Sequence, residues 1–214
     1  MARTYDQHCS LAHALDLVGE RWSLLVVREL LAGPLRFTDL ADGLVNVPSN
    51  VLTARLREME ANDLVCRRQL PPPASSVTVY ELTEDGRALG SAVTELARWG
   101  MRTLPRTTAG RPFHARWLVL ALRARFDPAA ARGVTEAYEF CIDDDDVVSV
   151  EVRDGQARAR VGEASDPAVR ISADADTLVA LSSGAISAKG AIARGARIEG
   201  TPRAIERMRA ILPG

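Results

Sequence analysis

Residues 36–83 read RFTDLADGLVNVPSNVLTARLREMEANDLVCRRQLPPPASSVTVYELT, and their periodicity indicates the fold of the first half of the chain. Residues 37–44 predict a short helix that ends in a glycine-containing turn, and residues 48–60 predict a second helix. Two alternating runs, 64–70 and 77–82, lie on either side of PPPASS, which is typical of a hairpin with a proline-stiffened loop. Helix, turn, helix and hairpin in this order predict a winged helix.

The second of these helices has an apolar and a polar face. The apolar stripe falls at positions i, i+4 and i+7 and consists of Leu52, Leu56 and Met59. Asn50, Thr53 and Arg57 fall on the opposite face and form one row, because residues three or four apart are neighbours on a helix. Amide, hydroxyl and guanidinium groups read base edges and phosphates in the major groove. A polar helix face can also be merely solvated; the hairpin that follows at once favours DNA binding.

The charge of the chain does not by itself favour a nucleic-acid partner. The 214 residues are 47% hydrophobic and 26% charged, which is typical of one or two globular domains, and the net charge is −1. The first 105 residues contain 11 Arg against 13 Asp and Glu. DNA binding must therefore depend on where a few arginines are placed, not on a bulk electrostatic field.

Several functional classes lack their sequence signals. The cysteines Cys9, Cys66 and Cys141 are odd in number and form no CxxC pair, which argues against a disulfide framework and a zinc site. There is no signal peptide and no apolar run of about 20 residues, so we expect a cytoplasmic protein without membrane association. Residues 143–146 (DDDD) lack the glycine and distal glutamate of a calcium loop, so a solvated turn is expected. With no catalytic set or phosphate-binding loop in the sequence, we expect no enzyme activity, cofactor or metal.

Helical patterns surround the winged helix. Residues 9–18 and 21–31 predict two helices, the second of them central and buried. A third helix should begin after Thr83 and run to about residue 101. Its apolar face, which includes Val93 and Leu96, exceeds what one winged helix can cover, which favours a dimer interface shared with the first helix. Packing against the second half of the same chain is the alternative.

The segments CSLAHALDLVGERWSLLVVRELLAGPLRFTDL, LTARLREMEANDLVCRR and YELTEDGRAL resemble the HxlR-type branch of bacterial winged-helix regulators over roughly residues 9–101. The resemblance implies a homodimer that binds a palindromic operator in double-stranded DNA. The family usually has a Ser cap where this chain has Pro48, so the cap would move to Ser49. It also commonly has basic residues at Asn50 and within 75–77, so phosphate affinity should be modest.

We therefore expect Asn50, Thr53 and Arg57 to read or position DNA from the recognition helix. Further candidates lie near the N-terminus of that helix, along it and on the wing: Ser49, Arg55, Arg67 and Arg68. Arg36 could anchor the start of the preceding helix on a phosphate, or could equally cap internal structure.

Cys9 is a candidate redox sensor. It lies at or near a helix start, where backbone N–H groups and the helix dipole favour a thiolate. Some HxlR-type proteins sense quinones or oxidants with a cysteine at this place, although plain packing is the alternative. Cys66 and Cys141 fall in strand-like runs and are expected to be buried and inert.

The second half of the chain has a different pattern. Residues 102–112 (RTLPRTTAGRP) are typical of a linker, which separates an expected DNA-binding and dimerisation domain, 1–104, from a second domain, 112–214. The second domain should contain a helix, a meander of four strands, two short helices, a last strand and a closing helix. This order predicts an α+β fold, with a C-terminal α/β sandwich beside the N-terminal winged helix.

The stretch AVRISADADTLVALSSGAISAKGAIARGARIEGTPRAIERMRAIL resembles the sterol-carrier-protein-2-like domain over roughly residues 113–214. The resemblance implies an apolar tunnel that could hold a small hydrophobic effector. The alternative is that these apolar residues simply fill the core. A rival function also follows, a lipid or hydrophobe carrier whose winged helix serves only dimerisation.

Overall fold

The structure is a computed structural model that describes residues 4–74, 76–106, 108, 110–143 and 146–213. The chain divides into two compact units, Met1–Val93 and Thr94–Gly214, and the boundary falls inside one helix, α5 (Glu84–Met101). Parts of the expected linker and of the expected turn at 143–146, namely residues 107, 109, 144 and 145, lie outside the described residues.

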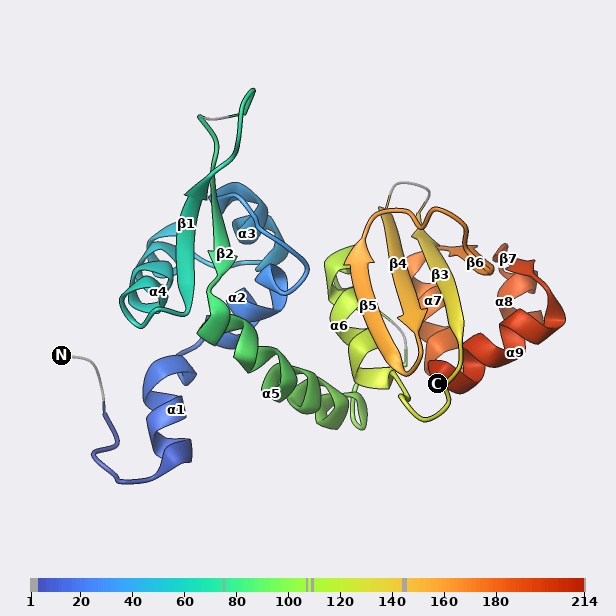
Figure 1. Ribbon diagram of the computed structural model, residues 1–214, viewed down its shortest axis with the longest axis horizontal. Helices are drawn as coiled ribbons and strands as arrows, with labels where there is room; N and C mark the ends of the chain where they lie inside the picture. The colour runs from blue at the N-terminus through green and yellow to red at the C-terminus, as the bar shows by residue number, and fades with distance from the viewer. Residues whose placement is uncertain (1–3, 75, 107, 109, 144–145, 214) are drawn as a thin grey trace. The chain divides into compact units, whose positions relative to one another are not determined.

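The first unit has the predicted winged helix-turn-helix order (Figure 1). Four helices come before the hairpin: α1 (Ser10–Val18), α2 (Ser23–Leu30), α3 (Phe37–Gly43) and α4 (Ser49–Ala61). The antiparallel hairpin consists of β1 (Val65–Gln69) and β2 (Thr78–Leu82). At the hairpin tip, Ser75 lies outside the described residues.

The core of this unit lies between the helices and the hairpin. Val26 and Val27 of α2 and Leu40 of α3 are fully buried. Leu35, in the connection before α3, exchanges two backbone hydrogen bonds with Tyr80 of β2, at 3.0 and 2.7 Å. This isolated bridge attaches the connection before α3 to the two-stranded wing, and the sequence did not predict it.

Arg28 and Glu29 of α2 form an ion pair, and Arg28 also joins this helix to α3. Glu29 is fully buried, and its carboxylate accepts a hydrogen bond of 2.8 Å from Nε of Arg28. Arg28 also donates to the backbone oxygen of Gly43, at 3.2 Å. A Cβ at Gly43 would lie 2.6 Å from a Glu29 oxygen, so only glycine lets the end of α3 approach this pair.

The second unit is a five-stranded mixed sheet with helices. Its strands are β3 (Thr135–Ile142), β4 (Asp146–Arg153), β5 (Gln156–Val161), β6 (Val169–Ala173) and β7 (Arg197–Gly200). Its helices after α5 are α6 (Ala115–Arg125), α7 (Ala175–Ser182), α8 (Ala188–Ala193) and α9 (Pro202–Ile211). These elements confirm the predicted order of helices and strands and the α+β class.

The strand order is β5-β4-β3-β6-β7, and here the expected meander of four strands was wrong. Strands β3, β4 and β5 do form a meander, but β6 returns to pair in parallel with β3 instead of with β5. The pattern of apolar residues could not reveal this, because alternation specifies which face of a strand is buried but not which strand lies beside it.

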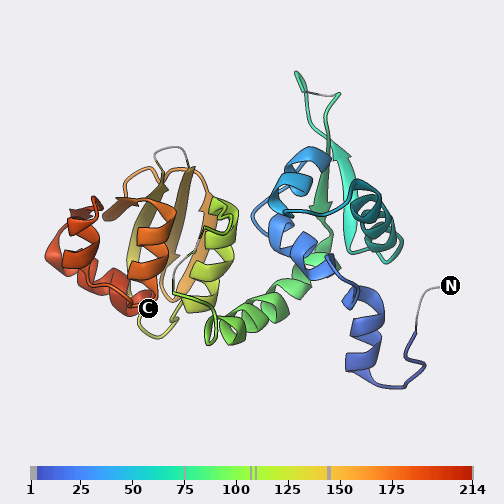
Figure 2. The same cartoon turned by 180° about the vertical axis from the view of Figure 1, so that it is seen from behind.

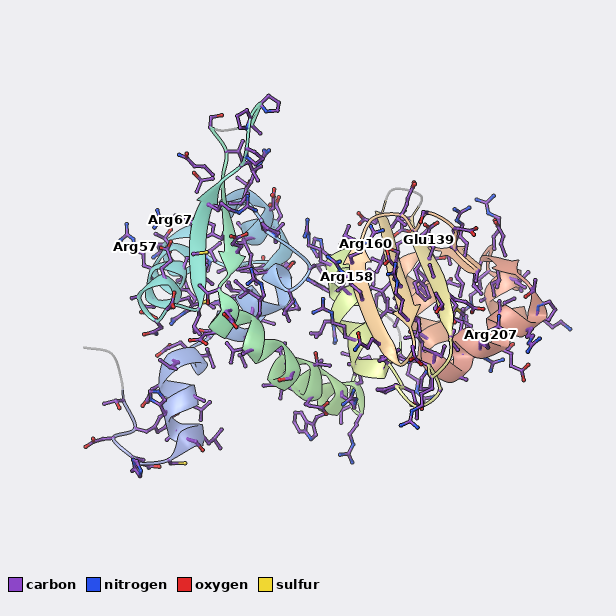
Figure 3. The ribbon with its side chains drawn as sticks, viewed as in Figure 1. Arg57, Arg67, Glu139, Arg158, Arg160 and Arg207 are labelled. Carbon is purple, nitrogen blue, oxygen red and sulfur yellow. The ribbon has the colours of Figure 1, made fainter. Side chains whose placement is uncertain are left out.

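The sheet has one apolar and one polar face. Side chains that are buried on the helix-covered face include Tyr138, Val148, Val150, Val152 and Ile171. Figures 1 and 2 show α6 and α7 on that side of the sheet. The opposite face carries Glu139, Arg158 and Arg160, among others (Figure 3).

Local turn and cap chemistry explains several element boundaries. Asp154 and Gly155 both have positive φ, 43° and 79°, as a two-residue hairpin turn between β4 and β5 requires. Thr201 caps α9 by accepting a hydrogen bond of 3.2 Å from the backbone N–H of Ala204. Pro202 follows at the first helical position, as predicted.

We predict that Gly86→Ala destabilises the protein by about 1–3 kcal/mol, because the new Cβ would lie 2.0 Å from the backbone oxygen of Leu64 and the backbone must move. Gly100→Ala on the same helix meets nothing within 4 Å and should be neutral or slightly stabilising. Urea denaturation of the two variants checks this. Equal effects of the two substitutions would contradict the close packing of α5 on Leu64.

Candidate nucleic-acid interface

The recognition helix α4 is oriented by its apolar stripe. Leu52, Leu56 and Met59 are 0–1% exposed. Asn50 and Arg57, on the other side of the helix, are exposed. The two faces predicted for this helix are therefore present, with the polar row turned toward solvent.

The first turn of α4 is built without a side-chain cap. Pro48 occupies the cap position in an extended conformation (φ −65°, ψ 137°), so the expected shift of the cap to Ser49 was wrong. Ser49 is instead the first helical residue, and its carbonyl oxygen accepts a hydrogen bond of 2.8 Å from the Thr53 hydroxyl. Thr53 is half-buried, and its oxygen can still accept a bond from an incoming donor.

The arginines predicted to contact DNA fall into two groups. Arg57 and Arg36 are exposed, and among the described residues no carboxylate lies within 4 Å of either guanidinium. Asp39 accepts a hydrogen bond of 3.2 Å from the Arg36 backbone N–H, so it holds the start of α3 without engaging the guanidinium. These two arginines can meet a phosphate or a base without first leaving an acid.

The wing arginines have partners of their own. Arg67 donates two hydrogen bonds to Glu60 of α4, at 2.6 and 2.8 Å, and its guanidinium lies 5.7 Å from the centre of the Tyr80 ring. Glu60 holds the Arg67 pKa above its ordinary value. Arg68 pairs with Glu81 on the neighbouring strand at 3.1 Å. Figure 3 shows Arg67 beside α4.

Arg55 also has acidic partners, although it lies on α4 itself. Its side chain is 11% exposed and faces Glu58 and Glu20, so it points into the unit and not along the polar row. The sequence could not identify these carboxylates as partners of Arg55, Arg67 and Arg68. The Arg55–Glu58 spacing of three residues was the single local signal.

Cys9 occupies the cap position of α1 and is exposed. The backbone N–H groups of Ala12 and Leu11 face the sulfur and lower the pKa of the Cys9 thiol. Cys66 and Cys141 are half-buried, and burial is the main reason that both thiols have a raised pKa. The Cys9 thiol thus differs chemically from the other two.

The polar face of the sheet in the second unit contains a buried carboxylate, Glu139, whose hydrogen bonds account for its burial. Glu139 is 2% exposed and accepts hydrogen bonds from the Ala164 backbone N–H at 2.8 Å and from Nε of Arg170 at 2.6 Å. Burial acts to raise the Glu139 pKa, but these donors outweigh it and the pKa is lowered. Glu139 therefore holds the loop before β6 onto the sheet.

Among the described residues, no three or more His, Cys, Asp or Glu side chains are grouped so that they could hold a metal ion. In the same part of the chain, no helix has the length and apolar character needed to cross a membrane.

An exposed polar row on the second helix of a helix-turn-helix, followed by a wing, defines a winged-helix DNA-binding protein. A profile of the HxlR-like helix-turn-helix family matches residues 17–108. The HTH-type transcriptional regulator YodB of Bacillus subtilis is 36% identical over 86 residues, which are 40% of this chain and 76% of YodB. The chain belongs to the HxlR-like family and is a DNA-binding transcriptional regulator of this type, a class whose names imply a non-enzymatic role.

One further relative and one solved structure are similar to part of this chain. An uncharacterized HTH-type transcriptional regulator of Mycobacterium bovis, Mb3122, is 43% identical over 100 residues, which are 45% of this chain. The match spans 60% of the length of that protein. The solved structure of reduced YodB has 30% sequence identity and a TM-score of 0.39, and the match covers 50% of this chain and all of that one.

We predict that Arg57→Ala weakens binding to a specific duplex by about 1–3 kcal/mol and hardly changes the melting temperature, because Arg57 is exposed and opposite the buried stripe. Arg209→Ala, which removes an exposed arginine from α9, is the matched control. Fluorescence anisotropy measures the affinity. Unchanged affinity of the Arg57 variant would remove this residue from the contact set.

We also predict that iodoacetamide alkylates Cys9 well before Cys66 and Cys141 near neutral pH. The thiolate is the nucleophile, and the Cys9 pKa is lowered while the other two are raised. Alkylation rates at several pH values, followed by peptide mass spectrometry, give the order directly. Equal rates at all three sites would show that the helix start does not activate Cys9.

Proposed function

We propose that the chain is a cytoplasmic, homodimeric regulator that binds a palindromic operator through residues 1–104. Asn50, Thr53 and Arg57 would read or position the DNA from α4. Ser49 would meet a phosphate at the start of the helix, where backbone N–H groups favour an anion. Arg36 would add an anchor at the start of α3.

The proposal rests on the exposure of Arg57 and on its lack of an acidic partner among the described residues. This arginine stands exposed in the polar row of α4 with no carboxylate within 4 Å in the described part of the chain. A guanidinium in this state is suited to a bidentate contact with guanine or with a phosphate. The chain has no large positive charge, so specific contacts must contribute much of the affinity.

The proposal is tested by selecting duplexes from a random library and from genomic fragments with the purified full-length protein. We expect a recurrent palindromic sequence with half-sites about one helical turn apart. Retention on heparin at low salt separates this function from the rival carrier function. A protein that selects no sequence and is not retained on heparin would favour the carrier.

Dimerisation is supported by the apolar side chains that α1 and α5 leave exposed. Helix α5 buries Gly86 and Val93 but exposes Leu96 and Trp99, at 51% and 66%. On α1, Leu11 is 67% exposed. Large apolar side chains that remain exposed along a helix are typical of an interface with another chain.

We predict that Leu96→Glu produces monomers in sedimentation and abolishes operator binding together with the dimer, because it places an unpaired charge in the interface at a cost of several kcal/mol. Ser91→Glu, at an exposed position of the same helix, should leave the dimer intact. A monomeric wild-type protein would contradict the proposed dimer. A Leu96→Glu variant that unfolds would make α5 part of the core and place the interface elsewhere.

For residues 112–214 we propose a sterol-carrier-protein-2-like module that binds a small hydrophobic effector. Support comes from its helices on one apolar sheet face and its closing helix α9, the layout the resemblance implied. Tyr138, Val148 and Ile211 on that face are fully buried. A ligand that binds there would therefore be closed off from bulk solvent.

We predict that a fluorescent fatty acid binds the full-length protein saturably and shifts operator affinity roughly 5–150-fold, the usual range of coupling between two sites. Butyrate, which carries the same carboxylate without the long chain, is the control. Anisotropy of labelled operator, with and without ligand, measures the shift. Binding that does not saturate would leave the module as an interaction domain.

Cys9 is the residue that we propose for an oxidant response. Its exposure and its lowered thiol pKa support this role, since redox-sensing cysteines are accessible and have thiolate character. Cys66 and Cys141 have neither property.

A further inference from the structure

Arg55 lies on the recognition helix but does not face outward with the polar row. Successive α-helical residues are separated by about 100°, so Arg55 and Arg57 point roughly 200° apart around α4. The Arg55 side chain is 11% exposed, and its Nε is buried with no hydrogen-bond partner among the described atoms. The side chain is thus held within the first unit.

Two carboxylates hold the Arg55 guanidinium there. Nη1 pairs with Glu58, one turn further along α4, and Nη2 lies 3.6 Å from Oε2 of Glu20. Glu20 lies in the corner between α1 and α2, immediately before Arg21 and Trp22. The ion pair with Glu20 therefore joins the recognition helix to a different part of the unit.

The corner between α1 and α2, which carries Glu20, has a constrained backbone. Trp22 has a left-handed backbone, with φ 82°, which a non-glycine residue adopts only when its surroundings hold it there. The Arg21 guanidinium lies 5.0 Å from the centre of the Trp22 ring. Near the C-terminal end of α4, the two hydrogen bonds between Arg67 and Glu60 join the helix to the wing. Ion pairs thus tie the middle of α4 to the α1–α2 corner and its C-terminal end to the wing.

We propose that Arg55 is a positioning residue and not a phosphate contact. The ion pair between Arg55 and Glu20 sets the rotation of α4 about its own axis. That rotation fixes the direction in which Asn50 and Arg57 point. Glu58, on the same helix, orients the Arg55 guanidinium. The Arg55 guanidinium is largely buried between two acids and would have to leave both of them to reach a phosphate. Arg57 is exposed and, among the described residues, has no such partners to leave. This inference rests on the proposed DNA-binding function.

The first test is Glu20→Asp in the full-length protein. This change conserves charge but withdraws the carboxylate by one methylene from a position that is 55% exposed, so the fold should persist. The probes are the tightest duplex that the wild type selects from a random library and a scrambled duplex of the same composition. We expect roughly 3- to 30-fold weaker binding to the selected duplex and unchanged binding to the scrambled one. Unchanged binding to both would overturn the inference.

The second test measures how affinity for the selected duplex depends on salt. The slope of log K against log salt should fall by about 0.9 for each phosphate contact that is lost. Arg55→Gln should leave the slope unchanged, whereas Arg57→Gln, the control at an unpaired arginine, should reduce it if Arg57 meets a phosphate. A reduced slope in Arg55→Gln would assign Arg55 a phosphate contact and overturn the inference.

Two comparisons make the outcome unambiguous. The double variant Glu20→Asp/Arg55→Gln should bind no more weakly than the weaker single variant, because both changes break the same interaction. If Arg55→Gln does not fold, Glu20→Asp decides the matter alone. If the wild type binds the selected and scrambled duplexes equally, the proposed function itself is overturned. If the wild type prefers the selected duplex and Glu20→Asp binds it with the same affinity, only the positioning role is overturned.

Discussion

Burial of one side of α4 is the constraint on which the DNA-binding surface depends. Leu52, Leu56 and Met59 are removed almost completely from water, and each such side chain stabilises the fold by about 1.5–3 kcal/mol. Because a helix is rigid, burial of this stripe forces Asn50 and Arg57 outward. The same hydrophobic term that stabilises the unit therefore also turns the polar row toward solvent.

In the first unit, neighbouring carboxylates decide which arginines are available to contact DNA. The first 105 residues are slightly acidic, which at first counts against DNA binding. The acids are not spread evenly, however, since Glu20, Glu60 and Glu81 each lie against one arginine. Paired arginines then serve to orient the helix and the wing, and Arg57 and Arg36 keep their charge for a partner. The exposed pairs of the wing arginines with Glu60 and Glu81 contribute only about 0–1 kcal/mol each to stability.

The second unit follows a different physical rule. Its sheet buries one apolar face beneath helices and leaves a polar face on which Glu139 holds a loop through Arg170 and a backbone N–H. The parallel pairing of β3 and β6 requires the chain to cross over after β5, which brings that loop across the polar face. The crossover and the buried carboxylate are therefore parts of the same arrangement.

Local pattern was sufficient for the elements and for the direction of the recognition helix, because helical periodicity, caps and turn residues act over a few positions. It also identified Cys9 at a helix start and the hairpin turn at Asp154 and Gly155. The bridge between Leu35 and Tyr80, the β3–β6 pairing and the pairing of Arg55 with Glu20 were beyond its reach. Each of these joins residues far apart in the chain, and such contacts exist only once the core has packed.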